Sequence, residues 1–266
     1  MSSLQKVSKR NVDIFILPNC NRFNHRRKPQ PFSDINDPIT PESFNFNKVP
    51  TREILLNVFE KHNTVLRKQS LYSAVKCFLL SANRYLCMGF NSLLAHASVN
   101  HLHFHFWQSP DYLRAMSTEI KPKYEDSMFF ELVDHPVDNF VLELTDLTVL
   151  DQFMDHLWML VMSCQQLRIA HNVFIARSKS SGYMRVVVWP RCSAFGAKNV
   201  SAVDSEVGFY VAVAELAGML VVASEDIAST LNYDKVESIL SNERLPENTL
   251  HILQCTLFEA LRTKQL

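Results

Sequence analysis

The sequence predicts an α+β fold in which helices pack against an antiparallel sheet. Strand-like runs recur at residues 101–107, 140–144, 171–177 and 184–190. Apolar residues at helical spacing occupy much of the chain between these runs. A chain with both patterns is expected to bury its apolar faces by packing the helices on the sheet.

The composition limits the classes of function. The chain has 266 residues, 47% of them hydrophobic and 20% charged, and its formal net charge is zero. A neutral chain has no global attraction for nucleic acid or an acidic membrane, and no long apolar run suggests a membrane span. Six scattered cysteines and a start without an apolar leader predict a cytoplasmic protein with reduced thiols.

We expect a single domain over residues 1–266, in which the N-terminal part, 11–107, carries the histidine-rich strand. Its first strand is predicted at 12–17, where a proline follows it. Helical spacing predicts one helix from residue 51 to 59 and another from about 71 to 86.

Cations in two segments of this part allow two interpretations. Arg27 lies in an Arg-Arg-Lys run before a proline, and Lys48 ends the run Phe-Asn-Phe-Asn-Lys. By default both are solvated surface side chains. The alternative is an anion site, because a guanidinium fork suits phosphate oxygens and an ammonium group can also contact a phosphate.

The histidine-rich run is the most informative stretch of the sequence. Three histidines alternate there with three apolar residues: His101, Leu102, His103, Phe104, His105 and Phe106. On a strand, successive side chains point to opposite faces, so the imidazoles would share one face and the apolar residues would enter a core. The same-face imidazoles could bind a divalent metal, supply a nucleophile with its helpers, or form a polar sheet face. The absence of Cys-x-x-Cys or His-Glu-x-x-His motifs weighs against the metal.

The C-terminal part, residues 108–266, supplies the other strands of the predicted sheet. The apolar spacing there is more typical of core packing than of a cofactor site. The predicted elements are a strand at 140–144, a helix at 146–168, strands at 171–177 and 184–190 around a Ser-Gly turn, and short helices within 224–266.

Several segments resemble one enzyme family. Gly-Phe-Asn-Ser-Leu at 89–93, followed by Ala-Ser-Val-Asn-His-Leu-His-Phe-His at 97–105, resembles the active-site segment of the GDP-D-glucose phosphorylases. It is also similar to that of the plant GDP-L-galactose phosphorylases. Further similar segments lie at 26–30, 44–48 and 195–198. These families belong to the histidine-triad superfamily, near its galactose-1-phosphate uridylyltransferase branch, so the resemblance implies a histidine-triad-like antiparallel sheet.

The resemblance also implies a reaction. His103 would attack the α-phosphorus of GDP-hexose, hexose-1-phosphate would leave, and inorganic phosphate would then release the guanylyl group as GDP. His101 would orient the ring or the phosphate, and His105 would assist the leaving group. No metal or other cofactor is required. The donors and cations expected on the phosphoryl oxygens are Arg27, Lys48, Asn91, Ser98 and Lys198.

The chain departs from the family pattern in three places. A hairpin found in the family between the two N-terminal helices is missing between His62 and Gln69. Leu94 and Ala95 stand where the family has paired glycines, which permit positive φ and close approach to phosphate. Met219 stands where the family motif Glu-Leu-Ala-Gly continues with histidine.

These departures leave three functions open. The chain could be a phosphorylase, a hydrolase that passes the guanylyl group to water, or an impaired or inactive relative that binds guanine nucleotide or acts as an interaction protein. A missing hairpin would also leave a smaller sheet or an exposed edge. Because such edges promote association, we expect concentration-dependent self-association, with a homo-oligomer as one outcome.

Overall fold

The structure is a computed structural model of the 266-residue chain. It confirms an α+β fold built on an antiparallel sheet with packed helices. The described residues are 5–9, 12–16, 65–97, 102–125, 127–194, 208–222 and 224–264.

The main sheet has seven strands in the order β4-β3-β8-β9-β7-β6-β5. Every neighbouring pair in it is antiparallel. The central strands β8 and β9 are apolar along most of their length because both of their faces are buried. The strands are β3 (Leu86–Asn91), β4 (His105–Gln108), β5 (Ile120–Pro122), β6 (Phe130–Leu132), β7 (Phe140–Leu144), β8 (Ala170–Arg177) and β9 (Met184–Arg191).

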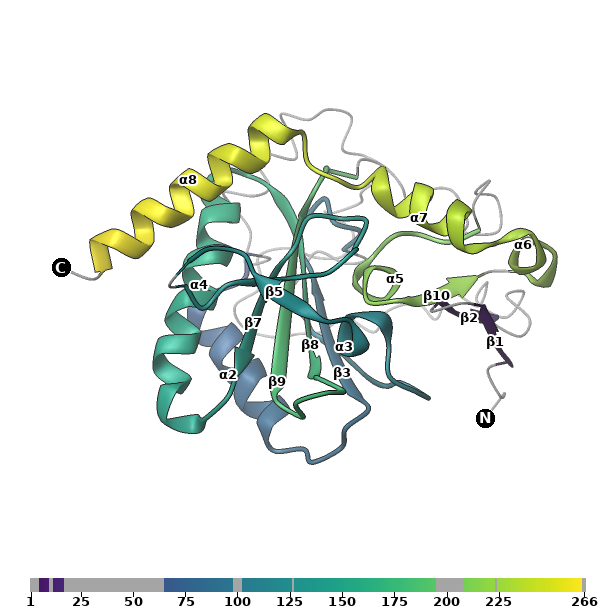
Figure 1. The fold of residues 1–266 in the computed structure, drawn as a ribbon, viewed down its shortest axis with the longest axis horizontal. Helices are drawn as coiled ribbons and strands as arrows, with labels where there is room; N and C mark the ends of the chain where they lie inside the picture. Colours follow the sequence, from purple (N-terminus) through teal and green to yellow (C-terminus); the bar gives the residue numbers. More distant parts are fainter. Residues whose placement is uncertain are drawn as a thin grey trace, which may run out of the picture.

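Three helices cover one face of this sheet (Figure 1). They are α2 (Lys68–Leu79), α4 (Leu150–Gln166) and α8 (Glu247–Lys264), and a 3₁₀ turn at Leu147–Val149 precedes α4. With the sheet they enclose the first core, which contains large side chains such as Phe78, Phe153 and Leu257.

The other face of the sheet encloses the second core, which contains Phe174, Trp189 and Val213. Short elements cover it, together with a small three-stranded sheet in which β10 pairs in parallel with β2 (Figure 1). The elements on this side are α3 (Arg114–Ser117), α5 (Val213–Leu216), α6 (Glu225–Thr230), α7 (Tyr233–Ser241), β1 (Gln5–Lys9), β2 (Val12–Ile16) and β10 (Met219–Val222).

Most predicted elements of the C-terminal part are confirmed, with bounds shifted by one to a few residues. The strands expected at 140–144, 171–177 and 184–190 are β7, β8 and β9, and the helix expected at 146–168 is the 3₁₀ turn with α4. Of the predicted terminal helices, α8 is not short but has 18 residues.

Two predictions in the N-terminal part need correction. The helix expected to reach residue 86 ends at Leu79, because a turn follows in which Ser81 Oγ accepts from Asn83 N and Asn83 Oδ1 accepts from Tyr85 N. Residues 86–91 then form β3, which contributes to the site described below. The histidine strand is shorter than expected: β4 starts at His105, and residues 102–104 have no regular structure. The helix expected at 51–59 and the junction from 62 to 64 lie outside the described residues.

Strand β4 is the last strand of the main sheet on its side. Within the described residues, no strand pairs with its outer edge, and Phe106 on β4 is 50% exposed. The prediction that Phe106 enters a core is therefore wrong, although Leu102 and Phe104 do pack against the first core. No helix in the described part of the chain is long and apolar enough to cross a membrane.

Candidate active site

Two of the three predicted catalytic histidines lie side by side. His103 Nε2 and His105 Nε2 are 3.0 Å apart, and the rings meet edge to face with centroids 4.6 Å apart. A neutral imidazole has one N–H, so this contact requires a proton on one Nε2 and a lone pair on the other. The structure thus places both rings on one face, as the alternation predicts, and His101 lies outside the described residues.

The histidine pair shares a face of the sheet with Asn91. His105 is opposite Gly89 in the β3–β4 ladder, and side chains two residues apart on a strand point the same way. Asn91 follows Gly89 by two residues, so it lies on the face of His105. Trp107, two residues after His105, packs there against the second core.

Gly89 allows α5 to approach this face closely. A Cβ atom built on Gly89 would lie 2.5 Å from Val213 Cγ1 and 3.1 Å from the Trp107 ring. The contact with Val213 is shorter than real carbon atoms allow and the contact with Trp107 is tight, so any larger residue would require Val213 on α5 to shift. The absent side chain therefore brings the start of α5 next to Asn91.

The side chain of Asn91 is oriented by two hydrogen bonds to its oxygen. Asn91 Oδ1 accepts from Asn172 Nδ2 at 2.6 Å and from the backbone N–H of Val213 at 3.1 Å. A backbone N–H can only donate, so the Asn91 atom at this position must be the oxygen. The amide nitrogen of Asn91 then points away from both partners.

The loop after β3 has strained backbone conformations where the family has glycines. Leu94 has a φ of 64° and His96 a φ of 60°, values that favour glycine. Ala95 does not have a positive φ, so the second left-handed residue is His96 and not the second of the replaced glycines. The backbone oxygen of Leu94 accepts from Ala194 N at 2.7 Å, which ties this loop to the end of β9.

The Glu-Leu-Ala-Gly motif forms α5 and the turn after it. Burial raises the pKa of the Glu215 carboxyl to about 7, and its Oε2 accepts from Ala212 N at 3.0 Å. Gly218 has a φ of 103°, and its α-carbon faces the backbone of Arg114. Met219 is the first residue of β10 and packs against the second core, so it occupies a strand position.

Sequence reasoning missed the residues that support Asn91. These are Asn172 on β8, Arg191 at the end of β9, and Glu243 in the turn after α7. A signal was present for Asn172, which is a polar residue near the start of an otherwise apolar strand. The predicted site residues Arg27, Lys48, Ser98 and Lys198 lie outside the described residues.

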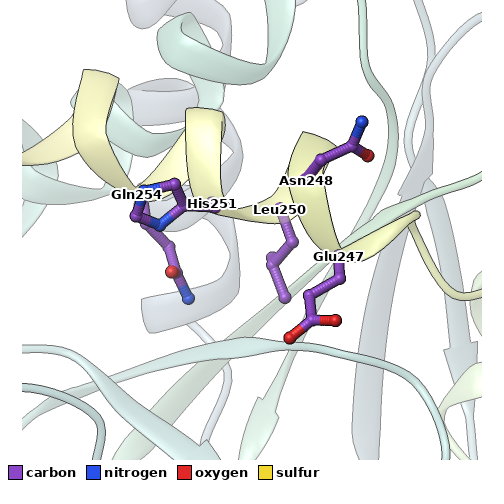
Figure 2. A pocket seen from close by; sticks show the side chains of 5 residues that line it. All are labelled: Glu247, Asn248, Leu250, His251 and Gln254. Atoms are coloured by element: carbon purple, nitrogen blue, oxygen red, sulfur yellow. The ribbon is translucent and has the colours of Figure 1, made fainter.

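A shallow open hollow lies elsewhere, on the N-terminal half of α8 (Figure 2). Helix α8 packs on the first core, whereas the histidine pair is on the face of the second core. The described lining includes none of the site residues and consists of Glu247, Asn248, Leu250, His251 and Gln254.

The fold and site define an α+β protein with a paired-histidine site, and two family models match the chain. The model described as GDPGP1-like, N-terminal domain, matches residues 57–107, and that described as GDPGP1-like, C-terminal domain, matches residues 112–264. The chain therefore belongs to the GDP-D-glucose phosphorylase family. No solved structure matches it.

Several relatives of the chain are named GDP-D-glucose phosphorylase 1. The chain is 31% identical over 294 residues to GDP-D-glucose phosphorylase 1 of Danio rerio, covering 89% of this chain and 79% of that protein. Identity to the Xenopus laevis protein of that name is 32% over 207 residues, or 74% of this chain and half of the relative. For the Homo sapiens protein it is 26% over 295 residues, covering 90% and 72%.

The alignments also bear on the missing hairpin. The aligned length of 294 residues with the Danio rerio protein exceeds the 266 residues of this chain. That relative thus has residues within the alignment that have no counterpart here, as expected if an internal segment is missing.

Proposed function

We propose that the chain is a GDP-hexose phosphorylase that acts on GDP-D-glucose through a guanylyl-histidine. The observation that carries the proposal is the contact between His103 Nε2 and His105 Nε2, 3.0 Å apart on the sheet face that holds Asn91. Membership of the family supports the same substrate class.

The histidine contact suits a nucleophile and a proton donor. With His103 as the acceptor, its Nε2 is unprotonated and can attack once the hydrogen bond from His105 breaks, and His105 carries the Nε2 proton. When His103 Nε2 bonds to the α-phosphorus, the bond from that phosphorus to the bridging oxygen breaks and hexose-1-phosphate leaves. The His105 N–H, released from His103, can then donate to the leaving oxygen.

The second half of the reaction regenerates the nucleophile. An oxygen of inorganic phosphate attacks the same phosphorus, the bond to His103 Nε2 breaks, and GDP is formed. Asn91 would donate from Nδ2 to a non-bridging oxygen in both steps. The predicted partners on the remaining oxygens are Arg27, Lys48, Ser98 and Lys198, with His101 beside the nucleophile.

One alternative has its own structural support. Leu94 occupies a conformation suited to glycine, and the described sheet ends at β4, the strand that carries His105. Both features favour a relative that keeps the fold and binds guanine nucleotide with little or no turnover. The acceptor distinguishes a phosphorylase from a hydrolase, because attack by phosphate on the guanylyl-histidine gives GDP and attack by water gives GMP.

Turnover of GDP-glucose by the purified protein, with and without phosphate, tests the proposal. We expect GDP and glucose-1-phosphate when phosphate is present, and covalent guanylylation of at most one site per chain when it is absent. Steady production of GMP would instead identify a hydrolase. Nucleotide binding without either product would support the inactive relative and contradict the proposal.

His103→Asn tests the assignment of the nucleophile. The variant should lose covalent labelling by GDP-glucose and all turnover, because asparagine cannot form the phosphorus–nitrogen bond. His156→Asn is the matched control, since His156 lies on α4 and its ring packs near Phe129, away from the site. Labelling that survives in His103→Asn would show that another residue is the nucleophile.

A further inference from the structure

We propose that Asn172, Arg191 and Glu243 are positioning residues that aim the side-chain amide nitrogen of Asn91 at the phosphoryl group. The inference rests on the proposed function for the identity of the ligand. The arrangement itself rests on a chain of buried and half-buried hydrogen bonds that starts at Asn91 and ends at an ion pair.

The first step is the free donor on Asn91. Its oxygen already accepts from Asn172 Nδ2 and from Val213 N, and the side chain is half-buried. Among the described residues, none accepts a hydrogen bond from Asn91 Nδ2. The orientation of this amide is therefore fixed, and its two N–H bonds are left for a ligand on the face of the histidine pair.

The second step is the fixed polarity of Asn172. Its Nδ2 donates to Asn91 Oδ1 at 2.6 Å and to the backbone oxygen of Ala95 at 3.0 Å. Its Oδ1 faces the Arg191 guanidinium, with Nη1 at 3.5 Å. Since a carbonyl can only accept and a guanidinium can only donate, the Asn172 amide cannot flip without losing its partners.

The third step anchors Arg191. Its side chain is fully buried, and it forms an ion pair with Glu243 and donates to the backbone oxygen of Val211. Val211 lies just before α5, and Glu243 lies between α7 and α8. A buried cation needs its partner, so this pair fixes Arg191 against both segments and, through Asn172, fixes Asn91.

A double-mutant cycle tests whether Asn172 acts through Asn91. The variants are Asn91→Ala, Asn172→Asp and the two combined. Aspartate keeps the shape of Asn172 but places an oxygen against Asn91 Oδ1 and the Ala95 carbonyl, two acceptors. The measurements are the single-turnover rate of guanylylation by GDP-glucose and the dissociation constant of GDP.

Asn139→Asp is the matched control. Asn139 is also buried, its Oδ1 accepts from Leu132 N at 2.8 Å, and its Nδ2 donates to the Val137 backbone oxygen at 3.0 Å. The substitution makes the same chemical change between β6 and β7, away from Asn91. If Asn172→Asp does not fold, as judged by circular dichroism, Asn172→Ala replaces it in the cycle.

Strong coupling is the expected result. Asn172→Asp should slow guanylylation by about 30- to 100-fold in the wild-type background, because misplacement by about an ångström costs roughly that much. In the Asn91→Ala background it should slow the rate by less than about threefold. Asn139→Asp should change the rate by less than about twofold.

Independent effects that multiply in the double variant would overturn the proposal, as would an equal effect of Asn139→Asp. If the wild type binds GDP but has no turnover, the proposed function fails on its own. The cycle measured on the GDP dissociation constant then decides the positioning role, and lack of coupling there overturns it. A wild type without affinity for GDP would overturn both.

Discussion

Leu94 offers a direct measure of the strain that the lost glycine leaves behind. Its φ of 64° places it in the left-handed region, and its side chain is only 8% exposed, against Ala95 and Ala170. Substituting it with glycine removes both the strain and the buried side chain. Comparing Leu94→Gly with Leu94→Ala cancels the loss of the side chain and leaves the effect of one Cβ atom.

The size of that effect follows from two opposing contributions. A left-handed conformation costs a non-glycine residue about 1–2 kcal/mol, which Leu94→Ala keeps and Leu94→Gly relieves. Glycine in turn loses about 0.5–1 kcal/mol more backbone entropy on folding than alanine does. We therefore expect Leu94→Gly to be more stable than Leu94→Ala by about 0.5–1 kcal/mol, although both fall below the wild type through lost burial.

Leu93 provides the matched control, because it is buried in the same loop without a positive φ. There only the entropy difference operates, so Leu93→Ala should be more stable than Leu93→Gly by about 0.5–1 kcal/mol. Urea unfolding of the four variants measures both differences. The reasoning is refuted if the order of glycine and alanine is the same at the two positions.

Two further predictions concern α5 and buried ionisable groups. Gly89→Ala should destabilise the protein by about 1–3 kcal/mol in urea unfolding, because the Cβ of the alanine would clash with Val213. The same clash would displace Val213 from Asn91 and weaken GDP binding. Unchanged GDP binding would contradict this role of Gly89. Burial lowers the pKa of His135 and of His171 from 6.5 to about 4 and raises that of Glu215 from 4.5 to about 7. Between pH 4.5 and 6.5 the unfolded chain thus binds about two more protons at these histidines and one fewer at this glutamate. The three groups together should therefore make stability rise by about 1.4 kcal/mol per pH unit. Glu215→Gln removes the opposing contribution, so the measured slope should increase by about 1.4 kcal/mol per pH unit; a slope that the variant leaves unchanged would show that Glu215 is ionised in the folded state.

The elements that could be predicted are helices with apolar residues on one face and strands that are apolar because both of their faces are buried. The strands β8 and β9 are apolar along most of their length, and α4 has its apolar residues at helical spacing. By contrast, β3 was missed because the helical spacing was extended through residues 80–85, where the turn-forming residues Ser81 and Asn83 separate α2 from the strand. The strands β5 and β6 have only three residues each, too few for a periodic signal.

The candidate site was predictable in part for the same reason. Strand alternation correctly placed His103 and His105 on one face, but it misplaced Phe106, which is half exposed on the edge strand β4. The support of Asn91 by Asn172 could not be predicted. The two residues are 81 positions apart, and only the register of β3 with β8 brings them together.

The histidine pair lies at one edge of the described sheet, so its position depends on contacts from the other side. Among the described strands, β4 has β3 as its only neighbour, so the sheet holds His105 from one side. On that side, Trp107 packs against Phe174, with ring centroids 5.9 Å apart, and Asn91 lies in its half-buried hydrogen-bond network. Hydrogen bonds that form a connected network restrict the geometry of the side chains that they join. On the proposed mechanism, the chain can therefore keep His103 aligned with Asn91 as long as the β3–β8 side is intact, although the hairpin found in the family is missing.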